Sequence, residues 1–153
     1  MAYTNVDNIK ALVRGLEIGT GTVITEDKLD LWIAQVGAYI DGRLASYYIT
    51  PITGAKSLKI VSMIADYKVT HIVKTVLELT SENSDKRQDV QTNLDFKAEK
   101  MLKDLLPTYS GNIIMEPVLK LPDADFVSRS PEKAALTSMS QQGGTFKKGG
   151  DNW

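Results

Sequence analysis

The chain contains no cysteine and only one histidine. Disulfides, thiolate metal sites and cysteine nucleophiles are therefore excluded. The histidine, His71, falls in the middle of a predicted helix, with Tyr67 and Thr75 one turn away on either side. Neither neighbour makes a convincing metal-binding or acid–base pair with an imidazole. We therefore expect His71 to be a packed or half-exposed helix residue rather than a catalytic group.

Long apolar runs and an excess of one charge are also missing. No stretch approaches the roughly 18 consecutive apolar residues of a membrane-spanning helix, and residues 1–7 lack the basic and apolar segments of a secretory signal. We expect a soluble, cytoplasmic protein without membrane contact. Over 153 residues, 18 Lys and Arg face 19 Asp and Glu. This balance argues against a dedicated nucleic-acid binder, whose affinity for phosphates comes from surplus cations.

Apolar residues recur at three- and four-residue spacing through the first two thirds of the chain, which predicts helices. Thr4 and Thr25 are candidate N-caps, and prolines end the second and fourth segments. The predicted helices cover about residues 5–15, 26–50, 56–79 and 86–106. Such lengths with short connections are typical of a helical bundle, and the wide apolar face of the third helix predicts that it is the most buried.

The second predicted helix has the most regular apolar stripe. The stripe consists of Leu29, Ile33, Val36, Ile40, Leu44 and Tyr47. It predicts that Tyr47 is buried and that Trp32, Tyr39 and Tyr48, beside the stripe, widen the face available to partners. Gly37 and Gly42 each weaken a helix by up to about 1 kcal/mol relative to Ala. Within so regular a stripe, they indicate close approach of a neighbouring helix.

The composition changes at Pro107. Residues 108–153 are rich in proline and glycine, and residues 112–116 are compatible with one short strand. Residues 137–153 hold too few large apolar side chains to offset the entropy of ordering them. We therefore predict an all-α fold: a small bundle of about four helices over residues 1–107, followed by an extended C-terminal arm over residues 108–153.

No motif indicates an enzyme, a cofactor or a metal site. Asp27 and Asp30 lie one turn apart, but acids at a helix start complement the helix dipole, which explains them without a metal. The glycines of residues 143–150 do not follow a phosphate-binding spacing. A helix-turn-helix is disfavoured because the second helix carries acids that would repel phosphate. A small helical DNA-binding or regulatory protein remains the alternative function.

Two segments carry a resemblance to a known family. Residues 39–52 contain Ile-Asp-x-x-Leu, beginning at Ile40, and Tyr-x-x-Pro-Ile, beginning at Tyr48. With residues 58–68, they resemble the head-completion proteins of long-tailed bacteriophages, also called connector or adaptor proteins. One departure is that Asp66 and Tyr67 follow Ala65 without the family's usual spacing. The match covers about residues 25–70, under a third of the chain.

The resemblance implies a structural protein of the virion neck, made in the host cytoplasm. Copies of the chain would form a dodecameric ring below the portal protein, which extends the DNA channel and presents a platform for a stopper or tail-completion protein. DNA would pass through without sequence-specific binding. The residues we expect at the interface between subunits are Trp32, Tyr39, Asp41 and Arg43. Those we expect to bind partners through the arm are Phe146, Lys147, Lys148 and Trp153.

Two of these expectations have competing interpretations. Asp41 and Arg43 are two residues apart and cannot pair with each other, so each is expected to bond to a neighbouring helix, to bond to the next subunit, or to be a solvated helix residue. The arm is interpreted as a docking segment, against the alternatives of a disordered terminus or an expression remnant.

Overall fold

The structure, a computed structural model, describes residues 1–80, 88–111 and 113–127. The described residues form four helices and one antiparallel pair of strands. The elements are α1 (Val6–Leu12), α2 (Glu26–Leu44), α3 (Ala55–Leu79), α4 (Gln88–Asp104), β1 (Thr108–Ser110) and β2 (Ile113–Met115). The predicted small helical bundle is confirmed, and β2 confirms the short strand expected near residues 112–116. The partner strand β1 was not predicted.

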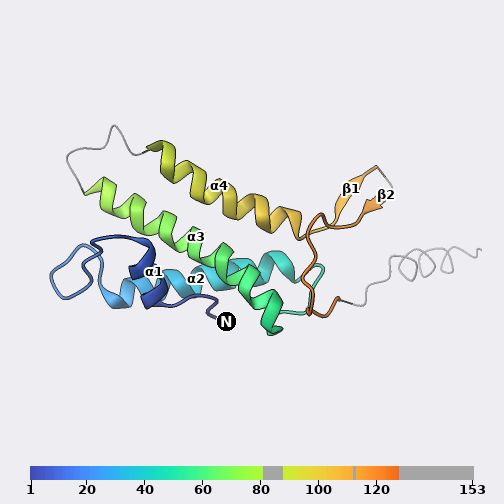
Figure 1. Cartoon of the computed structure of the whole chain (residues 1–153), viewed down its shortest axis with the longest axis horizontal. Helices are drawn as coiled ribbons and strands as arrows, with labels where there is room; N and C mark the ends of the chain where they lie inside the picture. The colour runs from blue at the N-terminus through green and yellow to red at the C-terminus, as the bar shows by residue number, and fades with distance from the viewer. Residues whose placement is uncertain (81–87, 112, 128–153) are drawn as a thin grey trace, which may run out of the picture.

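The central helix of the bundle is α3, which packs against α1, α2 and α4. In Figure 1, α4 lies along one side of α3 and α1 and α2 lie along the other, and the β1–β2 hairpin projects beyond the end of α4. The buried residues of α3 include Val61, Ile64, Ala65, Val69 and Val73. Their spacing of three and four residues places them on one broad face, which lets α3 pack against three other helices.

The N-terminal ends of α1 and α2 are capped by side chains, as the sequence indicates. Thr25 accepts a hydrogen bond from the backbone N–H of Lys28 at 3.4 Å, as predicted. For α1 the cap is Asn5, which accepts from the N–H of Asn8 at 2.8 Å. The predicted cap Thr4 is wrong, because its hydroxyl donates instead to the Asp66 carboxylate on α3. Thr4 therefore bonds to a side chain that is distant in the sequence instead of to the backbone N–H groups at the start of α1.

Helix α2 ends at Leu44, six residues before the predicted end next to Pro51. After a turn in which the N–H of Tyr48 donates to the carbonyl of Leu44 at 2.8 Å, the chain becomes extended. Its backbone then pairs with a distant segment: the N–H of Ile49 donates to Asp125, and the N–H of Val127 donates to Tyr47. The helix therefore stops where another part of the chain supplies backbone partners.

This early end changes which tyrosine is buried. Tyr48 is 0% exposed, whereas Tyr47 is half-buried. The prediction that Tyr47 completes the buried stripe is therefore wrong, and so is the prediction that Tyr48 belongs to the face available to partners. The rings of Tyr47 and Tyr48 meet edge to face with centroids 5.0 Å apart, and Phe126 packs against both. A helical stripe predicts burial only while the helix continues, and here the chain leaves the helix at Leu44.

Residues 117–127 pack on the bundle, although they lie beyond the predicted boundary at residue 107. Leu121 is 2% exposed and belongs to the hydrophobic core. Asp123 caps α3 by accepting from the backbone N–H groups of Lys56 and Ser57, each at 2.8 Å, and from the Ser57 hydroxyl. The N-cap residue of α3 is Gly54, which has no side chain to cap the helix. A distant carboxylate therefore satisfies donors that no local residue can satisfy. We call residues 117–127 the strap.

We expect Asp123→Ala to lower the melting temperature at pH 7 and to lower it less at pH 2. Hydrogen bonds from the Ser57 hydroxyl and from the N–H of Lys56 lower the pKa of Asp123 below its ordinary value of 3.8. A lowered pKa in the folded state means that the stabilisation is present above about pH 4 and is lost as the pH falls through the folded-state pKa. Thermal unfolding of the variant and of the unmodified protein, followed by circular dichroism at both pH values, measures the change in melting temperature.

The control variant is Asp125→Ala, which removes an exposed carboxylate two residues away. The melting temperature of this variant should follow that of the unmodified protein at both pH values. An Asp123→Ala effect of equal size at pH 7 and pH 2 would contradict an ionised cap.

Gly37 and Gly42 have different surroundings, although the sequence suggested one role for both. A Cβ atom on Gly37 would overlap the backbone carbonyl oxygen of Met1, whereas a Cβ atom on Gly42 would have nothing within 4 Å. The expected close approach is therefore present at Gly37, but the approaching segment is the chain's own N-terminus rather than a helix. The expectation is wrong for Gly42.

We expect opposite effects from alanine at these two positions. Gly42→Ala should raise the free energy of unfolding by about 0.5–1 kcal/mol, because alanine has the higher helix propensity. Gly37→Ala should lower it by about 1–3 kcal/mol, because the N-terminal segment must shift. Urea denaturation of the two variants measures both effects. Equal stabilisation by both would show that residues 1–3 do not lie against α2.

Candidate assembly surface

Asp41, one of the four residues predicted at a subunit interface, bonds within its own chain. Its carboxylate accepts from the Tyr3 hydroxyl and from the N-terminal ammonium of Met1 at 3.3 Å. The Tyr3 hydroxyl oxygen also accepts from the N–H of Ile52 at 2.8 Å. Burial raises the pKa of Tyr3, and its hydrogen bond to Asp41 raises it further. Asp41 thus fixes the N-terminal segment to α2 and to the turn that precedes α3.

Tyr39 joins three helices. Its hydroxyl donates to Glu99 of α4 at 2.7 Å, and the ammonium of Lys68 of α3 lies 4.8 Å from the centroid of its ring. Lys68 also forms salt bridges with Asp95 at 2.9 Å and with Glu99 at 2.5 Å. A cation over an aromatic face is attracted by the ring quadrupole. The cluster therefore ties α2, α3 and α4 together.

The charges of this cluster remain in place at neutral pH. Burial by itself lowers the pKa of Lys68, but the carboxylates of Glu99 and Asp95 outweigh it and the pKa rises. Burial raises the pKa of Glu99, but Lys68 and the Tyr39 hydroxyl outweigh it and the pKa falls. Both partners are thus held in their charged forms, and the arrangement connects helices rather than transferring protons.

The remaining two predicted interface residues differ in exposure. Trp32 is half-buried against the core, whereas Arg43 is exposed, with its guanidinium 6.0 Å from the Tyr39 ring centroid. At 100° per residue, Trp32, Tyr39 and Arg43 share one face of α2 and Asp41 lies opposite. The structure therefore brings three of the four together and separates Asp41. Their role between subunits stays a prediction.

The four predicted arm residues, Phe146, Lys147, Lys148 and Trp153, lie outside the described residues. His71 is half-buried and lines a cleft with Tyr39 and Lys68. Within residues 1–80, 88–111 and 113–127, no three His, Asp or Glu side chains gather closely enough to hold a metal ion. No helix in the described part of the chain is long and apolar enough to cross a bilayer.

The β1–β2 hairpin exposes large apolar side chains that sequence reasoning did not single out as a surface. Tyr109 pairs with Ile114 across the antiparallel strands, and every residue of both strands is exposed. Tyr109 is 72% exposed and Ile113 is 69% exposed. Residues 108–115 contain no charged side chain. The available signal was the unbroken apolar run Ile113–Met115, which lacks the polar alternation of a half-buried strand.

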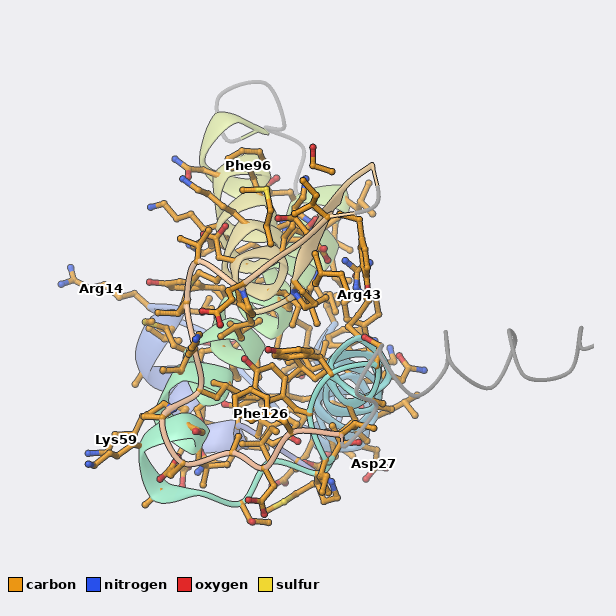
Figure 2. All side chains as sticks on the ribbon, turned by 90° about the vertical axis from the view of Figure 1, so that its right-hand side faces the viewer. Arg14, Asp27, Arg43, Lys59, Phe96 and Phe126 are labelled. Atoms are coloured by element: carbon orange, nitrogen blue, oxygen red, sulfur yellow. The ribbon has the colours of Figure 1, made fainter. Side chains whose placement is uncertain are left out.

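The surface continues from the hairpin into an open cleft of about 430 Å³ beside the end of α4. Two apolar side chains of this cleft are strongly exposed: Phe96 at 66% and Val118 at 85%. Figure 2 views the molecule from this side, with Phe96 and Arg43 labelled on α4 and α2. We call the surface the hairpin end; its apolar residues are Phe96, Tyr109, Ile113, Ile114, Met115 and Val118.

Cations border the hairpin end. Arg43, Lys100 and Lys103 line the cleft together with Glu99 and Asp104. Glu99 already engages Lys68 and Tyr39, whereas none of the three cations forms a salt bridge with another described residue. Large exposed apolar patches with a polar rim mark protein–protein contacts in soluble proteins. The hairpin end therefore has the chemistry of a surface that binds protein.

Comparison with protein families, with curated proteins and with solved structures found no match.

Proposed function

We propose that this protein is a structural head-to-tail connector of a tailed phage. It forms a ring below the portal protein, extends the DNA channel, and provides the platform for a stopper or tail-completion protein. Its role is to join protein assemblies, without enzymatic activity or a cofactor.

The observation that carries this proposal is the exposed apolar hairpin at one end of a packed bundle. A two-stranded hairpin is at best marginally stable in water. Leaving Tyr109, Ile113 and Met115 in solvent is unfavourable unless another protein covers them. The bundle itself supplies a rigid base, because α3 packs against all three other helices. A rigid body with an apolar projection is suited to assembly.

The charge distribution supports an assembly protein over the DNA-binding alternative. Helix α4 exposes Lys97, Lys100 and Lys103, but its sequence also contains Asp89, Asp95, Glu99 and Asp104. Affinity for duplex DNA rises with the number of phosphates that cations neutralise. A helix with four acids and three bases provides little of that affinity. Near-neutrality suits a channel protein that DNA must pass without being held.

Electron microscopy of the purified protein mixed with the portal protein of the same phage tests the proposal. We expect the protein to add a ring to the portal, and we expect Ile113→Ser with Met115→Ser to abolish that addition. Because both side chains are exposed, the melting temperature of this variant should stay close to that of the unmodified protein.

The matched control is Leu79→Ser, which changes an exposed leucine at the other end of α3. This variant should add to the portal normally. Absence of any portal complex, together with duplex binding that weakens steeply as salt rises, would overturn the connector and favour the DNA-binding alternative.

A further inference from the structure

The molecule carries opposite charges at its two ends. Helix α2 begins with Glu26 and has Arg43 in its last turn, and a rise of 1.5 Å per residue separates these positions by about 26 Å. In Figure 1, α1 and the start of α2 lie toward one end of the long axis, and the hairpin lies at the other. The two surfaces are therefore accessible to different neighbours at the same time.

The end opposite the hairpin contains an acidic groove of about 460 Å³ between α1 and the first half of α2. Asp7, Glu26 and Asp30 line it, with Lys10 as the only cation among its lining residues. None of these carboxylates forms a salt bridge with another described residue. Leu12, Val23 and Leu31 are also exposed on α1, the following loop and α2, but none of them lines the groove. We call this surface the acidic end.

We infer that a second copy of this chain covers the hairpin end, and that it does so with its acidic end. Arg43, Lys100 and Lys103 of one copy then face Asp7, Glu26 and Asp30 of the next, and the contact covers the exposed apolar side chains of the hairpin end. This inference rests on the proposed function, since it names the surfaces through which the ring would close.

The charges favour this head-to-tail contact over a symmetric dimer. In a two-fold dimer through the hairpin end, the three cations of each copy would be close to those of the other. Like charges placed together cost affinity, whereas opposite patches guide two proteins into one register. A contact between two different surfaces repeats from copy to copy, and it closes into a ring when the rotation between copies permits.

Charge reversal at each end tests the contact. The hairpin-end variant carries Lys100→Glu and Lys103→Glu, and the acidic-end variant carries Glu26→Lys and Asp30→Lys. Each variant is measured by sedimentation velocity, with and without portal protein. We expect the unmodified protein to assemble, and each variant alone to stay monomeric, because both of its ends then carry the same sign of charge.

An equal mixture of the two variants should assemble again, with both present in equal amounts. In the mixture, the unmodified hairpin end of the acidic-end variant can bind the unmodified acidic end of the hairpin-end variant. The two reversed ends can bind each other in the same way, so every contact joins opposite charges. A control variant carries Lys59→Glu and Lys97→Glu, at exposed lysines that do not line the cleft. It changes the net charge by the same amount as the hairpin-end variant. It should assemble like the unmodified protein, and circular dichroism checks that all variants are folded.

The outcomes separate this inference from the proposed function. If the unmodified protein assembles and the reversed variants assemble equally well, the head-to-tail contact is wrong and the connector function stands. If the variants are monomeric but their mixture does not reassemble, the pairing of these two surfaces is wrong. If the unmodified protein assembles neither alone nor on the portal, both the inference and the proposed function fail.

Discussion

Tyr48→Ala is expected to lower the free energy of unfolding by about 3–5 kcal/mol, the cost of removing a fully buried aromatic side chain. Tyr48 is among the largest fully buried side chains of the protein. Its ring contacts Tyr47 and Phe126, so the substitution opens a cavity where α2, the following turn and the strap meet. Urea denaturation followed by far-ultraviolet circular dichroism measures the change.

Two variants serve as controls for this result. Tyr47→Ala should cost clearly less than Tyr48→Ala, because Tyr47 is only half-buried. Tyr48→Phe keeps the ring and should retain most of the stability. A loss at Tyr47 as large as that at Tyr48 would mean that α2 continues past Leu44 and that its stripe reaches Tyr47.

Ending the chain at residue 116 is expected to destabilise the bundle severely, whereas ending it at residue 127 should leave the free energy of unfolding nearly unchanged. The shorter chain loses the strap. Removing buried Leu121 alone corresponds to about 2–5 kcal/mol. The Asp123 cap on α3 and the cover that Phe126 gives to Tyr48 disappear with it. Many small domains have total stabilities of only about 5–15 kcal/mol.

Thermal unfolding of the two truncated chains beside the full chain provides the measurement. The chain ending at residue 127 also tests the prediction that residues 137–153 contribute little to the stability of the bundle. If that chain loses as much stability as the one ending at residue 116, then residues 128–153 contribute to the core. If neither truncation matters, the strap does not belong to the packed bundle.

Much of the fold could be predicted because its signals are local. The α2 stripe from Leu29 to Leu44 repeats every three or four residues, which is sufficient to identify a helix and its buried face. Thr25 and the two acids that follow it, Glu26 and Asp27, mark the start of α2 by residues that are adjacent in the sequence. For the same reason, the bounds predicted for the third helix, 56–79, differ from those of α3 by one residue at the N-terminal end.

The candidate site was less predictable. Tyr39 was selected because it lies beside the α2 stripe, and Arg43 because it belongs to the segment that resembles the connector family. The structure places both on one exposed side of that helix. The sequence offered no means of seeing that Asp41 would turn to Tyr3 and Met1 instead. The hairpin was recognised only as one possible strand, because the exposure of a short apolar run depends on what the rest of the chain covers.

By itself, the sequence determined the helical class, the approximate helix bounds and the starts at Thr25 and near Asn5, because hydrophobic periodicity and capping act over one or two turns. The tertiary structure alone decided that α2 ends at Leu44, that Tyr48 is buried and that Asp123 caps α3. Each of these features depends on groups more than sixty residues apart in sequence. Such pairings form only when the folded backbone brings distant donors and acceptors together, so they cannot be predicted from patterns that extend over one or two helical turns.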